Sequence, residues 1–150
     1  MIGTLQGSGF GVEFPQNTWV MVTGASATTD PGQILTGTAT VGLAWDADSG
    51  VPEILERVLV DLCYQDATEG ADPTIIPFNG SYPPATNLAV HPGSQPLPGG
   101  LPFISVVSVA GIADPGAGVR TTWNVGVCVK NTSARLLLGF STNGWFAVTN

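Results

Sequence analysis

The sequence predicts an all-β fold: a two-sheet antiparallel β-sandwich, jelly-roll-like, with about eight strands and one long proline-rich loop. Apolar and polar residues alternate through most of the chain, which is the pattern of half-buried strands. Turns rich in Gly, Pro and Asp separate these alternating runs. Charged residues make up only 10% of the chain, and no long stretch is rich in helix-forming residues. These observations favour strands throughout.

The N-terminal part of the chain supplies the first strands of the predicted sandwich. Residues 1–17 are expected to form a Gly-rich lead-in or an edge strand, with a short strand near residues 11–14. Residues 18–150 are expected to form a single domain, which opens with an alternating run at 18–23. The run at 34–46 is the most regular in the chain, because its large apolar residues all fall in one phase. One face of this strand is therefore expected to lie in a core.

The other phase of this run predicts self-association. Up to Ala44 it contains only small, uncharged residues: Thr36, Thr38, Thr40, Gly42 and Ala44. A strand face left in water usually carries Lys or Glu, which discourage association. We therefore expect a homo-oligomer, with a trimer as the first expectation. An ordinary solvated Thr-rich face is the alternative.

The rest of the chain supplies the remaining strands. The further alternating runs are at residues 58–65, 103–110, 121–129, 135–140 and 145–149. Between the last two, Asn143-Gly144 is the dipeptide preferred in tight hairpin turns. The pattern therefore predicts a hairpin there, with the chain closing as a final strand.

A long irregular segment, residues 66–102, contains most of the 12 prolines. Proline removes a backbone donor and fixes φ, so the segment is expected to lie outside the core and to contact partners. Its aromatic residues Phe78 and Tyr82, its histidine His91 and the strand residue Trp145 are the candidate binding residues. An exposed aromatic ring can stack on a sugar or fill an interface, although core packing is the usual role of a strand Trp.

Catalysis is not expected from these residues. His91 is the only histidine of the chain, and no G-x-S-x-G nucleophile motif accompanies it. A structural or solvated loop histidine is therefore the favoured interpretation.

The two cysteines occupy equivalent places in two similar runs. Cys63 lies in residues 58–65 and Cys128 in residues 121–129, each in the phase opposite the large apolar residues. If the two strands are neighbours, both thiols lie on the same side of one sheet. This arrangement predicts one intrachain disulfide, which indicates an oxidising compartment.

The charge and the hydropathy of the sequence argue against two classes of partner, nucleic acids and membranes. The net charge is −7, and the 4 basic residues do not cluster, so no positive surface is available to neutralise nucleic-acid phosphates. No apolar run approaches the roughly 18 residues of a membrane-spanning helix. No nucleic acid, no membrane insertion and no cofactor are therefore expected.

One turn contains a candidate calcium site. Asp46 and Asp48 offer closely spaced oxygens, but the glycine position and Arg57 depart from the EF-hand pattern. Aspartates also favour tight turns through local hydrogen bonds. A structural turn is the favoured interpretation, and no other metal site is expected.

The C-terminal third resembles a known family. Residues 105–112, the turn at 115–118, residues 122–127 and the closing Gly144-Trp145-Phe146-Ala147-Val148-Thr149 are similar to trimeric jelly-roll heads of the tumour-necrosis-factor and complement-head type. Such heads often end bacterial collagen-like proteins and phage fibres. The resemblance implies a homotrimer with sheets packed around a threefold axis. The chain departs from the family in lacking a Gly-X-Y repeat and in its proline-rich loop.

These features favour a non-catalytic structural or interaction subunit of an extracellular fibre, a virion or a surface assembly. The alternative is a carbohydrate-binding, lectin-like module for adhesion or receptor binding, with a glycan or a protein receptor as its partner. Both interpretations place the protein outside the cell, on a cell surface or in a virion.

Overall fold

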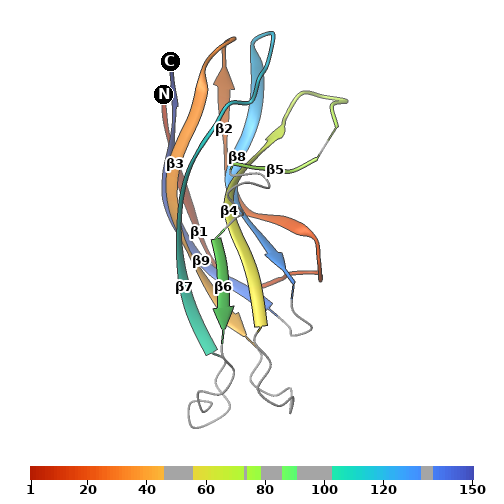
Figure 1. Cartoon of the computed structure of the whole chain (residues 1–150), viewed down its shortest axis with the longest axis vertical. Helices are drawn as coiled ribbons and strands as arrows, with labels where there is room; N and C mark the ends of the chain where they lie inside the picture. The colour runs from red at the N-terminus through yellow and green to blue at the C-terminus, as the bar shows by residue number, and fades with distance from the viewer. Residues whose placement is uncertain (46–55, 73, 79–85, 91–102, 133–136) are drawn as a thin grey trace.

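The computed structural model describes residues 1–45, 56–72, 74–78, 86–90, 103–132 and 137–150. These residues contain nine strands and no helix (Figure 1). The strands are β1 (Ile2–Glu13), β2 (Trp19–Thr29), β3 (Ile34–Trp45), β4 (Glu56–Asp66), β5 (Ile76–Pro77), β6 (Thr86–Val90), β7 (Phe103–Ala113), β8 (Thr121–Asn131) and β9 (Leu137–Thr149).

The strands form two antiparallel sheets that pack together, which confirms the predicted two-sheet β-sandwich. Sheet A has the order β1-β9-β3-β7. Sheet B has the order β2-β8-β4-β5, and β6 also pairs with β4. In Figure 1 the strands of sheet A lie on the left and those of sheet B on the right, with the two termini side by side at the top of sheet A. The backbone N–H of Val148 donates to the carbonyl of Met1 there, at 3.1 Å.

The strand pairs are nested along the chain. β1 pairs with β9, β2 with β8, β3 with β7 and β4 with β6, all antiparallel. The chain therefore pairs like one long hairpin that is folded over. Two further strand pairs join these nested pairs into the two sheets. These are β3 with β9 in sheet A and β4 with β8 in sheet B.

The core lies between the sheets, where the alternation of the sequence places the apolar side chains. In β3, Leu35, Val41 and Leu43 are fully buried, whereas Thr38 and Thr40 in the other phase are only partly buried. Burial of an aliphatic side chain of this size contributes about 1.5–3 kcal/mol. The buried residues of the cluster are Leu5, Phe14, Ala27, Leu35, Ala39, Val41, Leu43, Val58, Val60, Leu62, Tyr64, Phe78, Val107, Val109, Ala113, Trp123, Val125, Val127, Val129 and Phe146.

Two strands differ from the expectation. β1 begins at Ile2 and runs to Glu13 at the edge of sheet A, so it is much longer than the short strand expected near residues 11–14. The hairpin expected at Asn143-Gly144 is wrong, because both residues lie inside β9. A Cβ at Gly144 would lie 2.5 Å from the carbonyl oxygen of Thr38 and 2.6 Å from the Cβ of Ala39. The glycine is therefore required for the close approach of β9 to β3 rather than for a turn.

The proline-rich segment also differs from the expectation. Thr86–Val90 forms β6 and pairs with β4, so this part of the segment belongs to sheet B. Ile76–Pro77 forms β5, and the N–H of Phe78 then donates to the carbonyl of Leu62 at 2.8 Å. These backbone bonds bring Phe78 into the core cluster. The prediction that residues 66–102 lie outside the core is therefore wrong for Phe78.

Candidate functional site

The disulfide between Cys63 and Cys128 is confirmed. It joins the neighbouring strands β4 and β8, with 5.9 Å between the two Cα atoms. Both residues are fully buried on the outer side of sheet B. The alternation predicted this side, since the residues next to each cysteine in sequence point into the core.

The candidate binding residues do not form one site. Phe78, expected to be exposed, retains only 8% exposure, and its ring packs edge-on against Tyr64 with 6.0 Å between centroids. It is therefore a core residue and not a binding residue. Trp145 is 45% exposed and is the one candidate that the structure places at the surface. Tyr82, His91, Asp46 and Asp48 lie outside the described residues.

Three aromatic residues, Tyr64, Phe78 and Trp123, form a cluster in the core. Tyr64 lies between Phe78 and Trp123, and its ring meets the Trp123 ring edge-on at 5.3 Å between centroids. The indole N–H of Trp123 donates to the hydroxyl of Thr29 at 2.8 Å. Burial, together with the nearby carboxylate of Asp114, raises the pKa of Tyr64. The three rings belong to the core cluster.

The acidic loops do not suggest a metal centre. Among the residues that the structure describes, no group of three or more His, Cys, Asp or Glu side chains could hold a metal ion. The side chain of Asp66 bonds to the backbone N–H of Thr68 at 2.8 Å, and hydrogen bonds from Thr68 lower the pKa of Asp66. Asp30 pairs with Arg120 at 3.4 Å on the surface, where an ion pair adds little stability.

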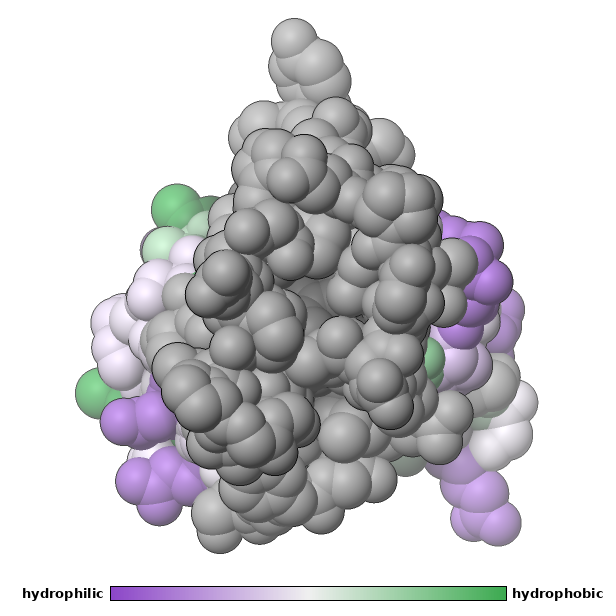
Figure 2. Space-filling model, turned by 90° about the horizontal axis from the view of Figure 1, so that it is seen from below, coloured by the Kyte–Doolittle hydropathy of each residue, from purple (hydrophilic) through white to green (hydrophobic). Residues whose placement is uncertain are grey.

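The outer face of sheet A is uncharged over its described side chains. We call the following residues the sheet A face: Ile2, Thr4, Gln6, Thr36, Thr38, Thr40, Ser108, Ala110, Ile112, Ser141, Asn143, Trp145 and Ala147. Ile2 is 78% exposed and Ile112 is 64% exposed, at opposite edges of the sheet. In Figure 2 pale, green and purple atoms lie on the left, the side of sheet A in Figure 1. Soluble strand faces of this size usually carry Lys or Glu.

Among the described strands, β7 is an edge strand of sheet A on this face. β7 pairs with β3 in unbroken register from Phe103 to Ala113 and contains no charge and no proline. Within the described part of the chain, β7 has no second strand partner. Its exposed residues Ser108, Ala110 and Ile112 continue the sheet A face to this edge.

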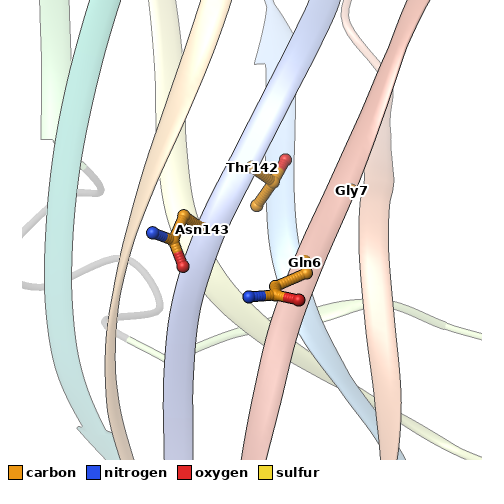
Figure 3. A pocket seen from close by; sticks show the side chains of 4 residues that line it. All are labelled: Gln6, Gly7, Thr142 and Asn143. Atoms are coloured by element: carbon orange, nitrogen blue, oxygen red, sulfur yellow. The ribbon is translucent and has the colours of Figure 1, made fainter.

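A polar hollow lies at the opposite half of the face, between β1 and β9. We call it the amide pocket: it has a volume of about 330 Å³ and is lined by Gln6, Gly7, Thr142 and Asn143. Gln6 lies directly opposite Asn143 in the strand pair. Figure 3 shows the Asn143 amide on one side of β9 and the Gln6 amide between β9 and β1. Trp145 lies two residues beyond Asn143 on the same face.

Irregular strand pairing lies next to the amide pocket. The register of β1 against β9 shifts between Ser8 and Val12, and that of β3 against β9 shifts between Gly42 and Leu43. Such bulges bend a strand and disturb its ladder. Thr142, at the same level, is buried, and its hydroxyl has no hydrogen-bond partner.

The sequence did not single out Gln6 or Asn143. The sequence pattern predicts a lead-in or edge strand for Gln6 and a turn for Asn143, so it does not indicate that the two residues pair across neighbouring strands. A usable signal exists in the alternation of Thr4, Gln6 and Ser8 with glycines and Leu5, which is a strand pattern.

Comparison with known proteins does not place the chain in a family, since neither a protein-family model nor a curated protein sequence matches it. The described residues also include no helix with the length and hydropathy to cross a membrane.

Proposed function

We propose that this protein is a non-catalytic structural or interaction subunit that assembles as a homo-oligomer outside the cell. The observation that carries the proposal is the long, uncharged edge strand β7. We call its outward residues Ser108, Ala110 and Ile112 the β7 half of the sheet A face. Natural proteins usually blunt such edges with charge, proline or a bulge, because an open edge pairs with other chains. β7 has none of these protections.

A second copy of the chain is the occupant that fits this surface. Each copy has a net charge of −7, so two copies repel one another wherever carboxylates meet. The β7 half of the face presents no described charge, and it offers Ala110 and the exposed Ile112 for burial. Backbone pairing or face packing at β7 therefore brings two copies together without burying an unpaired charge.

A trimer is the first expectation for this assembly. Nested pairs of first with last strand, second with second-last and so on are what a jelly roll contains, and they support that assignment. The resemblance of the C-terminal third to trimeric jelly-roll heads points to the same order of assembly. The buried disulfide supports an extracellular, cell-surface or virion location, since such bonds persist in oxidising surroundings.

Light scattering on the purified protein tests the proposal. The expected mass is a multiple of 15.4 kDa, threefold for a trimer. Ala110→Arg places a charge on the β7 half and should give a folded monomer. Thr28→Arg is the matched control, because Thr28 is a partly buried strand residue in sheet B, and this variant should keep the wild-type mass. A wild-type mass of 15.4 kDa at all concentrations would contradict the proposal.

A further inference from the structure

We propose that the amide pocket, with Trp145 beside it, binds a neutral carbohydrate. This site lies on β1 and β9, whereas the proposed subunit contact lies on β7, the far edge of the same sheet. The inference does not depend on the oligomer, and it adds a ligand to a protein whose proposed role is assembly.

The lining of the pocket selects against charged ligands. Its described residues are two amides, one hydroxyl residue and one glycine. A metal cation would find no carboxylate among them, and a phosphate or sulfate would find no Lys or Arg. A neutral ligand with many polar groups needs no charged side chain in the pocket, because it can bind through hydrogen bonds alone.

The two amides match the hydroxyl groups of a sugar. Each amide offers two N–H donors and one carbonyl acceptor, while each sugar hydroxyl both donates and accepts. Gln6 and Asn143 are a directly opposed cross-strand pair, so their amides are close enough to contact neighbouring hydroxyls of one ring.

Trp145 supplies the apolar half of sugar recognition. Its side chain is 45% exposed in the middle of a sheet, although a Trp of this size normally buries its ring. It follows Asn143 by two residues on the same face, which is about 7 Å along a strand. Its neighbours across the strands are Thr4 and Thr38, which are small and leave the ring accessible. An exposed indole in this position can stack on the C–H face of a pyranose while the amides bind its hydroxyls.

The size of the pocket indicates a short ligand. A volume of about 330 Å³ is at the lower end of ligand pockets, which hold roughly 300–1,000 Å³. One sugar residue in the pocket, with a second stacked on Trp145, fits this arrangement better than a folded peptide segment.

Glycan-array binding with the intact chain tests the site. The array holds neutral oligosaccharides together with sialylated and sulfated glycans, and the best neutral ligand is then titrated against tryptophan fluorescence. Trp145→Ala and Asn143→Ala are each expected to weaken binding on the order of tenfold, the usual scale for losing a buried contact or hydrogen bond. Asn124→Ala is the matched control, since Asn124 is an exposed strand amide on the outer side of sheet B, and it should bind as wild type does.

The possible outcomes separate this inference from the proposed function. The carbohydrate site would be overturned if the wild type bound no neutral glycan or bound anionic glycans alone. It would also be overturned if the double variant Trp145→Ala, Asn143→Ala still bound the glycan. Light scattering on the same samples reports the oligomer independently. A monomer that binds a neutral glycan would overturn the assembly and support the site, and an oligomer without glycan binding would do the reverse.

Discussion

Cys63 and Cys128 do not face one another directly across β4 and β8. Cys63 lies opposite Gly126, and Cys128 lies opposite Asp61, so the disulfide runs diagonally between the strands. Gly126 leaves space beside Cys63, and the side chain of Met21 lies over it: a Cβ at Gly126 would be 2.8 Å from the Met21 Cγ atom. The pairing of a cysteine with a glycine therefore accommodates the bond on a covered side of the sheet.

Replacing both cysteines with alanine is expected to destabilise the protein. The bond spans 65 residues, and chain-entropy models give a contribution of about 4 kcal/mol for a closed loop of this length. Guanidinium unfolding of the double alanine variant should therefore show a much lower midpoint with a similar native fold. An unchanged free energy of unfolding would mean that the unfolded chain is not constrained by the bond. The native protein should also react with no thiol reagent, because the described cysteines are both oxidised and buried.

Gly144→Ala is expected to destabilise the sandwich by about 1–3 kcal/mol, the usual range for overpacking. The new Cβ would meet backbone and Cβ atoms of Thr38 and Ala39, which cannot rotate away. Thermal unfolding followed by circular dichroism measures the effect. Gly118→Ala is a suitable control, because nothing lies within 4 Å of a Cβ built there. Equal effects of the two substitutions would contradict a close approach of β9 to β3.

The Asn143-Gly144 dipeptide shows which features the sequence could predict. Strand phase is local, so the core faces of β3, β4 and β8 and the disulfide followed from alternation. The role of Gly144 depends on Ala39, a residue more than a hundred positions away, and no local pattern contains that contact. The same limit applies to the amide pocket, because Gln6 and Asn143 meet only through the pairing of the first strand with the last. The prediction that Phe78 is exposed was wrong for a related reason, since the burial of Phe78 depends on backbone pairing with β4.

Stability is expected to fall as the pH rises above about 10, through Tyr64. Burial and the charge of Asp114 raise the pKa of Tyr64 above its ordinary value of 10.0. The unfolded chain then ionises its tyrosine at lower pH than the folded protein does. The contribution of Tyr64 is therefore fully present below pH 10 and is lost as the pH rises through the folded-state pKa. Comparing urea unfolding of wild type and Tyr64→Phe between pH 8 and 11 isolates this effect, and parallel pH dependence in the two proteins would contradict it.

Thr142→Val is expected to leave the fold intact and to raise the free energy of unfolding by about 1 kcal/mol. The Thr142 hydroxyl is buried without a hydrogen-bond partner, so the folded protein bears a desolvation cost that valine removes at nearly the same shape. Thr29→Val is the contrasting variant, because the Thr29 hydroxyl accepts from Trp123, and its loss should be destabilising. Destabilisation by both substitutions would show that the Thr142 hydroxyl has a partner in solution, such as a bound water.

Thr38→Arg should weaken the oligomer without unfolding the protomer. Thr38 on β3 lies directly opposite Ala110 on β7, so it borders the proposed subunit contact. A guanidinium there would have to be buried without a partner when two copies meet, which is costly. The substitution also removes the bond from the Thr38 hydroxyl to the carbonyl of Val109, at 3.0 Å. Thr38→Val removes that bond without adding charge and serves as the control. Analytical ultracentrifugation should show dissociation for Thr38→Arg and wild-type assembly for Thr38→Val. Assembly of both variants with wild-type affinity would place the subunit contact elsewhere on the molecule.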